Sequence, residues 1–404
     1  LQDIHDMVLR DRNHPSVVIY CLCNEVGCDI GDADGGVFAA QFKGAINAAD
    51  TTRPITANTE WTVGSPDTLT TVLDVMTTSY NYAAYDIYHK HHPFRPFMGG
   101  ESASCRSNRG YFGATNATRG LVNGDTAPKC AATAWAAAAS TEWASGSVAW
   151  TGHDYKGEPG TGWPDVGSYF GVYDIAGFEK DISAYYRSWW LKSGATFVRA
   201  SPSDWTAPVA VGANVHVFVY TGAAAAEAIV NGVSLGRKPV AALGFADFGL
   251  VPFAPGNLTA VAYDQSGAVV AADYVLTAGA PAALQLSVED SNGRPYAADG
   301  EDVALVRCAV VDSAGRVVPG ASQKVTFTVV GPGAVYGVGN GDPANLTPDK
   351  VGMKDLPYGG VWVIPAYAGL VRAIVETVAG QPGKVVVHAT AEGLVASSVS
   401  FTTV

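Results

Sequence analysis

The strongest constraint on the fold is a change of pattern along the chain. Up to about Trp190, short apolar runs alternate with stretches of helical character, whereas beyond about Phe197 the chain consists of short Val- and Ala-rich runs separated by Gly, Pro, Asn and Asp. Alternating strands and helices are typical of a parallel sheet with helical cover, and successive short strands are typical of β-sandwiches. The sequence therefore predicts a multidomain chain with a boundary near residue 193.

The first part, residues 1–192, has the pattern of a partial barrel. Five runs are too short and apolar for surface helices, and we expect them to be strands: Ser16–Cys23, Pro54–Ala57, Val72–Thr77, Pro96–Gly99 and Ser147–Trp150. Helical stretches lie between them: Gly35–Ala49, Tyr85–His91 and Lys129–Trp143. Five strands correspond to the second half of a (β/α)8 TIM barrel.

The remainder predicts two further domains, residues 193–279 and 280–404. Strands are expected in the first at Val215–Tyr220, Glu227–Val230, Leu258–Tyr263 and Tyr274–Leu276, with a hairpin turn at Asn231-Gly232. They are expected in the second at Leu284–Val288, Val303–Val311, Gln323–Val330, Val371–Glu376 and Lys384–Ala391. Both domains have the size of immunoglobulin-like β-sandwiches.

Composition excludes several classes of partner. A net charge of −12 with a pI near 5.0 argues against nucleic acid and anionic membranes, and no stretch approaches the roughly 18–20 apolar residues of a membrane span. The chain begins with Leu1 rather than Met, within an amphipathic stretch, which we interpret as missing upstream sequence. Sequons at Asn116, Asn257 and Asn345 favour a secreted or extracytoplasmic protein without fixing the compartment.

The cysteines and histidines give no clear site. Six cysteines match neither a disulfide framework nor a zinc pattern, so we interpret them as buried or partly buried free thiols. The run from His89 to His92 is interrupted by Lys90 and suits a solvated helix end. We therefore expect neither a metal site nor a cofactor.

Polar side chains follow the predicted strands, where a barrel builds its active site. Asn24 and Glu25 end the first run, and Glu101 follows Gly99 and Gly100, which we expect to turn the backbone tightly. Two facing carboxyls are what glycoside hydrolysis needs, since one protonates the leaving oxygen while the other attacks the anomeric carbon. The residues alone leave open that each glutamate is an ordinary strand-end residue.

Further side chains could complete such a site. Four aromatic residues at or just after predicted strand ends offer rings for sugar stacking: Tyr80, Tyr82, Trp150 and Trp163. Any one of these rings could instead fill the barrel. We expect Glu60 to have a structural or rim role, whereas Asp154 and Glu158 either bind sugar hydroxyls or fix a loop through an ion pair.

The segment RDRNHPSVVIYCLCNE resembles the acid/base signature of glycoside hydrolase family 2, and RPFMGGESAS is similar to the segment that carries the nucleophile in that family. The resemblance implies that Glu25 is the general acid/base and Glu101 the nucleophile. It also implies that Asn24 donates a hydrogen bond to the sugar 2-hydroxyl.

The segment SYNY resembles the end of the sixth barrel strand of the family, where an Asn and a Tyr approach the nucleophile. This implies roles for Asn81 and Tyr82, with Tyr80 as a rival because two extra residues precede the motif. AWTGHDYKGEP and WPDVGSYFGVYDIAGFEKD are similar to the eighth strand and following loop of bacterial-type β-galactosidases. They imply that Trp150 lies under the sugar and Trp163 near the pocket rim.

The resemblance covers nearly the whole chain, because VHVFVYTGAAAAEAIVNGVSLGRK and ADGEDVALVRCAVVDSAGRVVPGA resemble the sandwich modules after the barrel. It implies a retaining hydrolase of terminal β-D-galactosides, with a β-linked oligosaccharide or glycoside as substrate. A β-glucuronidase or β-mannosidase of the same family is an alternative. Another is a catalytically incomplete fragment that acts as a carbohydrate-binding or structural piece, and assembly into a homo-oligomer stays open.

Overall fold

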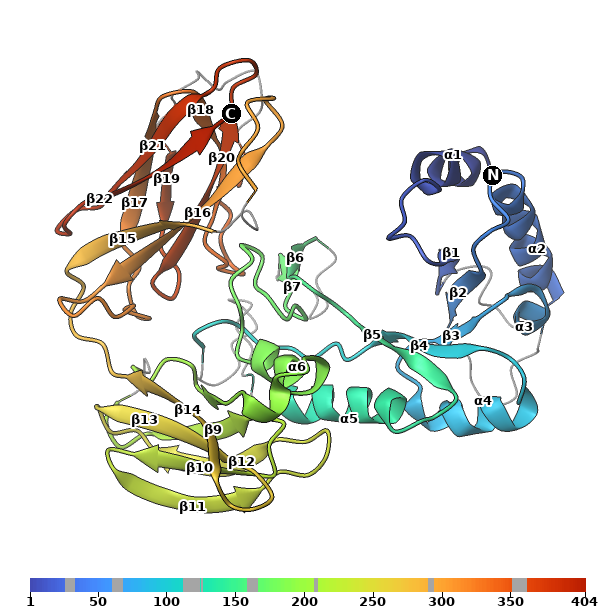
Figure 1. Cartoon of the computed structure of the whole chain (residues 1–404), viewed down its shortest axis with the longest axis horizontal. Helices are drawn as coiled ribbons and strands as arrows, with labels where there is room; N and C mark the ends of the chain where they lie inside the picture. The colour runs from blue at the N-terminus through green and yellow to red at the C-terminus, as the bar shows by residue number, and fades with distance from the viewer. Residues whose placement is uncertain are drawn as a thin grey trace. The chain divides into compact units, whose positions relative to one another are not determined.

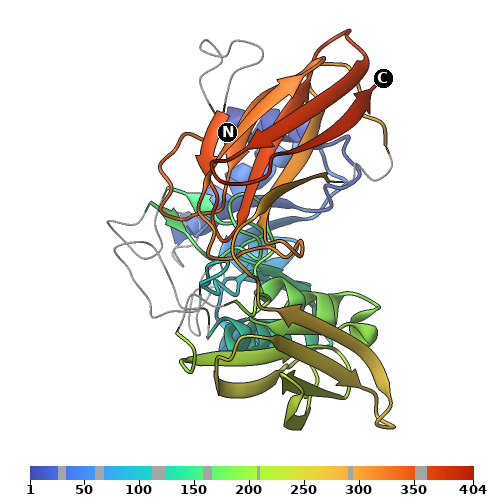
Figure 2. The same cartoon turned by 90° about the vertical axis from the view of Figure 1, so that its left-hand side faces the viewer.

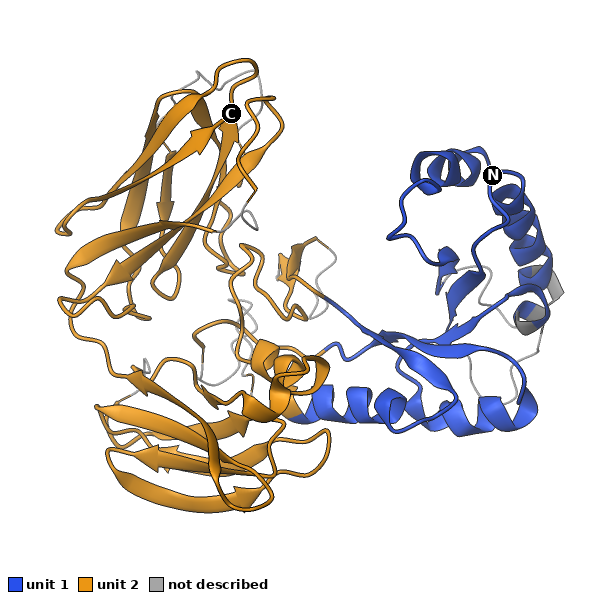
Figure 3. Ribbon diagram, viewed as in Figure 1, with its two compact units in different colours: residues 1–104, 129–151 blue, residues 105–128, 152–404 orange. Residues whose placement is uncertain are grey.

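The structure is a computed structural model that describes residues 1–25, 33–59, 68–111, 124, 126–157, 166–206, 210–289, 294–350 and 362–404. The chain forms two compact units, coloured separately in Figure 3. Residues 1–104 and 129–151 make up the first unit, and residues 105–128 and 152–404 make up the second. The boundaries predicted near residues 193 and 280 both lie within the second unit and stay a prediction.

A five-stranded parallel sheet organises the first unit (Figure 1). Its strands lie side by side in chain order: β1 (Tyr20–Asn24), β2 (Ile55–Thr59), β3 (Met76–Thr78), β4 (Phe97–Ser102) and β5 (Ala144–Ala149). Each link between neighbouring strands contains a helix: α2 (Ala33–Asn47), α3 (Thr68–Val72), α4 (Tyr85–His91) and α5 (Ala127–Ala139). A further helix, α1 (Gln2–Asp11), precedes β1. The predicted parallel sheet is confirmed, with helical links that permit parallel pairing.

The core of this unit is filled from both strands and helices. Ile55 and Phe97 on the strands are buried, together with Ile46 of α2 and Tyr88 of α4. Strand β2 buries residues on both faces, as parallel strands usually do.

Strand β1 departs from the prediction. We expected a strand over Ser16–Cys23, but the strand begins at Tyr20, and Val18, which precedes it, is 72% exposed. Within β1, Tyr20 and Leu22 are buried while Cys21 is exposed. The reason is that β1 is an edge strand of the described sheet, so one side of it has no neighbouring strand.

The second unit contains two pairs of antiparallel sheets. The first pair combines the order β11-β10-β13-β14 with β12-β9-β8. The strands are β8 (Arg199–Ser201), β9 (Asn214–Tyr220), β10 (Ala225–Val230), β11 (Val233–Pro239), β12 (Ala246–Pro252), β13 (Asn257–Tyr263) and β14 (Val269–Leu276). The predicted hairpin is confirmed, because Val230 pairs with Val233 and both Asn231 and Gly232 have positive φ, as a two-residue turn requires.

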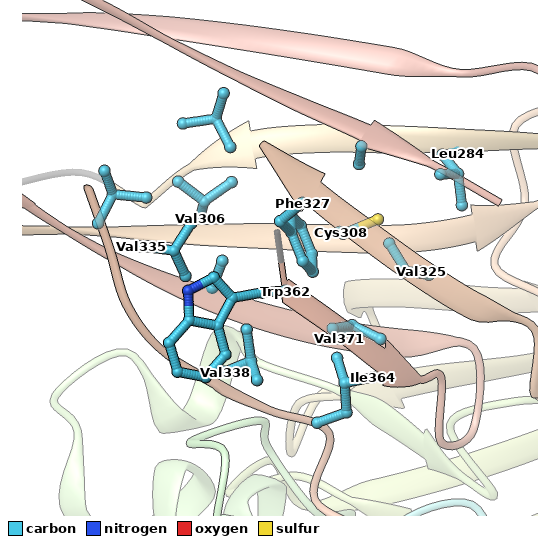
Figure 4. Packing of buried hydrophobic residues seen from close by; sticks show 14 of the residues in the cluster. Leu284, Val306, Cys308, Val325, Phe327, Val335, Val338, Trp362, Ile364 and Val371 are labelled. Carbon is cyan, nitrogen blue, oxygen red and sulfur yellow. The ribbon is translucent and has the colours of Figure 1, made fainter. Parts of the chain in front are cut away.

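The second pair, drawn in orange to red in Figures 1 and 2, combines the order β15-β16-β20-β18 with β19-β17-β21-β22. The strands are β15 (Ala283–Val288), β16 (Val303–Val311), β17 (Lys324–Val330), β18 (Gly333–Gly339), β19 (Trp362–Pro365), β20 (Leu370–Thr377), β21 (Gly383–Thr390) and β22 (Ser397–Thr403). Side chains of both sheets meet in one core, including Val306 and Val371 from one sheet and Phe327 and Ile364 from the other (Figure 4). Two sheets on a shared core make a sandwich, while its immunoglobulin-like character stays a prediction.

Along the chain, the second unit has the short strands β6 (Tyr155–Lys156) and β7 (Gly167–Ser168) and the helix α6 (Ile182–Trp190) before β8. A buried ion pair joins Arg109 Nε to Asp174 Oδ2 at 2.6 Å. Arg109 also donates to the backbone oxygens of Asn340 and Tyr367, each at 2.8 Å, which ties this region to the last sandwich. None of the helices in the described ranges is long and apolar enough to cross a membrane.

The structure corrects the interpretation of the cysteines as free thiols. Cys23, Cys105 and Cys130 are disulfide-bonded, whereas Cys21 and Cys308 are free. Spacing along the chain did not predict this because disulfide partners are set by proximity in space.

Candidate active site

Polar residues of four neighbouring strands gather at the C-terminal edge of the parallel sheet. Glu25 directly follows β1, Asn58 is the fourth residue of β2, Tyr80 lies two residues after β3, and Glu101 is the fifth residue of β4. The carboxyl ends of parallel strands meet at one edge, which is where barrel enzymes place their catalytic groups.

Glu101 is held by donors on both of its carboxylate oxygens. The Tyr80 hydroxyl donates to Oε1 at 2.5 Å, and Nδ2 of Asn58 makes a longer contact with Oε2 at 3.4 Å. The Tyr80 hydroxyl also bonds with Oγ of Ser104 at 2.6 Å. Burial and the hydrogen bond to Glu101 raise the pKa of Tyr80, so its phenol stays protonated and can donate to the carboxylate.

Glu25 has a different environment. Its backbone N–H donates to the carbonyl oxygen of Asn58 at 3.0 Å. Its Oε1 atom is buried and has no hydrogen-bond partner among the described residues. The charge of Glu25 contributes to raising the pKa of Tyr80, so the two side chains interact electrostatically. One glutamate is therefore held by protein donors, while the other has a buried oxygen with no hydrogen-bond partner among the described residues.

The backbone at this edge adopts uncommon conformations. Glu25, Tyr80 and Ala103 have φ values of 44°, 49° and 62°, in the left-handed region that non-glycine residues seldom occupy. All three lie at or just after strand ends. Such outliers cluster at functional sites, where the surrounding structure holds them in place.

The structure places the rival tyrosine, Tyr80, on Glu101. Tyr82 is half-buried, and its hydroxyl accepts a hydrogen bond from the backbone N–H of Ala103 at 3.1 Å. Asn81 is also half-buried and immediately precedes the short 3-10 helix η1 (Tyr82–Ala84). The two extra residues before the motif therefore shift the phenol that contacts the carboxylate by two positions.

The two glycines before Glu101 have another role than the one we expected. Gly99 and Gly100 continue strand β4, and neither has a positive φ, so no tight turn occurs there. A Cβ on Gly100 would lie 2.0 Å from Oδ1 of Asn58, and a Cβ on Gly99 would lie 2.4 Å from the hydroxyl of Tyr85. Glycine is needed because neighbouring side chains cross closely over the strand.

Other predicted residues are placed as follows. Asn24 is exposed, and its Oδ1 accepts a hydrogen bond from Nδ2 of Asn58 at 2.6 Å. Trp150 follows β5 and is 37% exposed, which leaves its ring partly accessible to a ligand. Trp163, Glu60 and Glu158 lie outside the described residues.

Asp154 lies in the second unit and forms an ion pair of the kind that fixes a loop. Its Oδ1 accepts from Nζ of Lys180 at 2.6 Å and from the N–H of Gly171 at 2.9 Å, and both charged side chains are buried. Burial raises the pKa of Asp154 to about 6 and lowers the pKa of Lys180. These contacts favour the ion-pair alternative over direct sugar binding.

The histidine run of α4 belongs to a different environment. The ring of His89 stacks on Trp143, with the ring centres 4.3 Å apart. In the part of the chain that the structure describes, no group of three His, Cys, Asp or Glu side chains is arranged to hold a metal ion.

Asn58 is the residue at this edge that sequence reasoning missed. The segment ITANT carries it as a single amide near the end of a strand. Asn is depleted in strands, so its presence at the end of a buried parallel strand is the signal that could have identified it.

Comparison with known families agrees with this arrangement. Residues 1–103 match the model described as glycosyl hydrolases family 2, TIM barrel domain, and residues 284–400 match glycoside hydrolase family 2 C-terminal domain 5. Residues 212–271 match a domain of unknown function.

Individual relatives point the same way. Beta-galactosidase BoGH2A of Bacteroides ovatus is 32% identical over 97% of this chain and 50% of its own length. A putative beta-glucuronidase of Formosa agariphila is 27% identical over 85% of this chain and 35% of its own. A solved glycosyl hydrolase family 2 member from Bacteroides cellulosilyticus has a TM-score of 0.82 at 24% identity and covers 100% of this chain and 51% of that one, a likeness of fold.

The chain spans half or less of the length of these curated relatives. The family motifs around Glu25 and Glu101 lie in the segment that matches the barrel model, and the relative that is 32% identical over 97% of this chain is named a beta-galactosidase. The chain belongs to glycoside hydrolase family 2 and is β-galactosidase-like.

Proposed function

We propose that the complete protein containing this chain hydrolyses a β-linked glycoside with retention of configuration, using Glu101 as nucleophile and Glu25 as general acid/base. The observation that carries the proposal is the placement of Glu101 between Tyr80 and Asn58, with Glu25 bonded through its backbone to the same Asn58. Two carboxyls on the C-terminal edge of one parallel sheet are the pair that double displacement requires.

In the first step, a carboxylate oxygen of Glu101 attacks the anomeric carbon while the bond to the leaving oxygen breaks. Glu25 gives its proton to that oxygen, so the aglycone departs as a neutral alcohol. The hydrogen bond from Tyr80 orients the Glu101 carboxylate for this attack.

In the second step, Glu25 takes a proton from water as that water attacks the anomeric carbon. The bond between the sugar and Glu101 breaks, which regenerates the carboxylate and the protonated acid. The buried Oε1 of Glu25, which lacks a partner among the described residues, is the atom we assign to this proton transfer.

The substrate we propose is a terminal β-D-galactoside. The proposal is supported by the relative from Bacteroides ovatus that is named a beta-galactosidase. A β-glucuronide is the second candidate, because a relative from Formosa agariphila is named a putative beta-glucuronidase. We assign sugar contacts to Asn24, Asn81, Tyr82, Trp150 and Trp163.

The fold proposal is that residues 1–192 are the second half of a (β/α)8 barrel, followed by immunoglobulin-like sandwiches at residues 193–279 and 280–404. The five parallel strands and the barrel-model match of residues 1–103 support it. In this proposal the sugar pocket is completed by the remaining strands of the complete protein, and this chain alone is catalytically incomplete.

The decisive experiment replaces Glu101 by Gln in the complete protein. We expect a loss of nearly all turnover of a nitrophenyl β-galactoside, because the amide cannot act as the nucleophile. Wild-type-like turnover by this variant would rule out the nucleophile assignment.

A panel of nitrophenyl glycosides on the unaltered complete protein tests the sugar. Preference for the galactoside over the glucuronide and the mannoside supports the first candidate, and preference for the glucuronide supports the second. Proton NMR of the first-formed anomer tests retention, because an inverted product would exclude double displacement.

A further inference from the structure

The side chain of Asn58 uses its full hydrogen-bonding capacity at the sheet edge. Its Oδ1 accepts from the backbone N–H of Glu101 at 3.1 Å and from Oγ of Ser79 at 3.0 Å. Its Nδ2 donates to Oδ1 of Asn24 at 2.6 Å and contacts Oε2 of Glu101 at 3.4 Å. A primary amide offers two acceptor and two donor positions, so all four are occupied.

This set of partners determines which way the amide faces. If the amide were reversed, its NH2 group would face the N–H of Glu101, and its oxygen would face two other oxygens, from Asn24 and Glu101. Both changes replace attraction by repulsion. Asn58 therefore has one stable orientation.

The orientation of Asn58 fixes that of its neighbour. Asn24 is the register partner of Asn58 across β1 and β2, and its Oδ1 is occupied by the bond from Asn58. The amide NH2 of Asn24 is thereby left as the group able to donate elsewhere. In the proposed function, that donor is the one that meets the sugar.

We propose that Asn58 is a positioning residue that acts through Glu101 and Asn24, setting the nucleophile carboxylate and presenting Asn24 as a donor. The inference rests on the proposed function of Glu101 and extends it to a residue on a third strand. Asn58 on β2 contacts both β4, through Glu101, and the end of β1, where its backbone oxygen also accepts from the N–H of Glu25.

The room for this amide is provided by Gly100. A Cβ at that position would lie 2.0 Å from Oδ1 of Asn58, far inside contact distance. Replacing Gly100 by Ala should therefore displace the Asn58 amide. The added methyl group makes no hydrogen bond, so its effect would be steric alone.

The first test compares Asn58→Ala with Asn47→Ala in the complete protein, using a nitrophenyl β-glycoside that the panel above identifies as a substrate. We expect Asn58→Ala to lower kcat by about 10- to 100-fold with a smaller change in KM, as losses of supporting hydrogen bonds do. Asn47 is exposed in α2 and serves as the matched control with unchanged kcat. Wild-type kcat for Asn58→Ala would overturn the proposal.

The second test uses the isosteric Asn58→Asp, which keeps the shape of the side chain and so guards against a failure of Asn58→Ala to fold. It places a carboxylate near Oε2 of Glu101, which should raise the pKa of the nucleophile through like-charge repulsion. We expect the acid limb of the kcat/KM profile to move to higher pH by about one pH unit. A merely structural role would leave this limb in place, and an unmoved limb contradicts the proposal.

The third test is a double-mutant cycle. Gly100→Ala alone should lower kcat as Asn58→Ala does, and the double variant should lose no more than either single variant, because both changes remove the same amide contacts. If the fold-losses in kcat of the two single variants multiplied in the double variant, the two changes would act independently, and this result would overturn the proposed coupling.

The outcomes separate this inference from the proposed function. An active Glu101→Gln variant would refute the function, whatever Asn58 does. An inactive Glu101→Gln variant together with fully active Asn58→Ala would refute the role of Asn58 alone. Thermal unfolding of each variant, compared with the unaltered protein, identifies losses of activity that arise from misfolding.

Discussion

Asp50 and Glu25, at opposite ends of the parallel sheet, have opposite environments. At the N-terminal end, Oδ1 of Asp50 accepts from the N–H and hydroxyl of Thr52 at 2.8 and 2.6 Å. Its Oδ2 accepts from Arg53 at 2.6 Å and from the hydroxyl of Tyr20 at 3.0 Å. At the C-terminal end, Glu25 keeps a buried oxygen with no partner in the described chain and has a left-handed backbone.

This contrast distinguishes the Asp50 network, which stabilises the fold, from the candidate active site at the C-terminal edge. The Asp50 network links the starts of β1 and β2, and Arg53 extends it by donating to the backbone oxygens of Val17 and His14. Its partners are all protein groups, so it contributes to folding. At the other end, Glu25 retains an unused oxygen and a strained backbone, which a folded protein tolerates where a ligand or a reaction uses them.

The largest expected effect is at Glu25. In the complete protein, Glu25→Ala should lower kcat/KM by about 10³-fold for a glycoside with a poor leaving group, because proton donation is lost. The loss should be much smaller for a nitrophenyl leaving group, which departs without protonation. Glu142→Ala, at an exposed glutamate of the same unit, is the control. Equal losses for both leaving groups would contradict the acid role.

The next effect is at Tyr80. Tyr80→Phe should lower kcat by about 10- to 100-fold, because the Glu101 carboxylate loses the hydroxyl that donates to its Oε1 while the aromatic ring remains. Tyr82→Phe should have a smaller effect, since the Tyr82 hydroxyl serves the backbone of Ala103. Steady-state kinetics of both variants give the comparison. A larger loss of kcat for Tyr82→Phe would instead favour Tyr82, the tyrosine that the motif implies, as the one that orients Glu101.

At the opposite end, Asp50→Asn should change stability and leave kcat as it is. The hydrogen bonds to Asp50 hold its pKa well below the usual 3.8, so its stabilising contribution is present above about pH 4 and is lost as the pH falls below that value. Thermal melts should therefore show a lowered Tm at pH 7 and a smaller difference from the unaltered protein at pH 3. A difference that grows on acidification would contradict this sign.

The smallest expected effect is at Tyr20. Tyr20→Phe removes one hydrogen bond to Asp50, which keeps its contacts with Thr52 and Arg53. The free energy of unfolding should fall by about 1 kcal/mol, the usual net value of one such bond. Urea unfolding at pH 7 measures this free energy. A fall in kcat without a change in stability would contradict a purely stabilising role for this end of the sheet.

Much of the fold was predictable because hydrophobic patterning is local. The helix at Tyr85–His91 and the strand at Val303–Val311 have the bounds that the sequence predicts. The strands β18, β19 and β22 were not predicted, because β18 contains three glycines, β19 has only four residues and β22 consists mostly of Ser and Thr. The predicted start of β1 at Ser16 was wrong, because an apolar run does not show where pairing with the next strand begins or which strand lies at an edge.

The sequence by itself determined which carboxylates lie at strand ends, because Asn24-Glu25 and Gly100-Glu101 stand directly beside apolar runs. Only the tertiary structure decided which groups meet them. It placed Tyr80 on Glu101, with Tyr82 on the backbone of Ala103, and it brought Asn58 between β1 and β4. The physical reason is that strand pairing and register fix contacts between distant residues, whereas periodicity reports only on local neighbours.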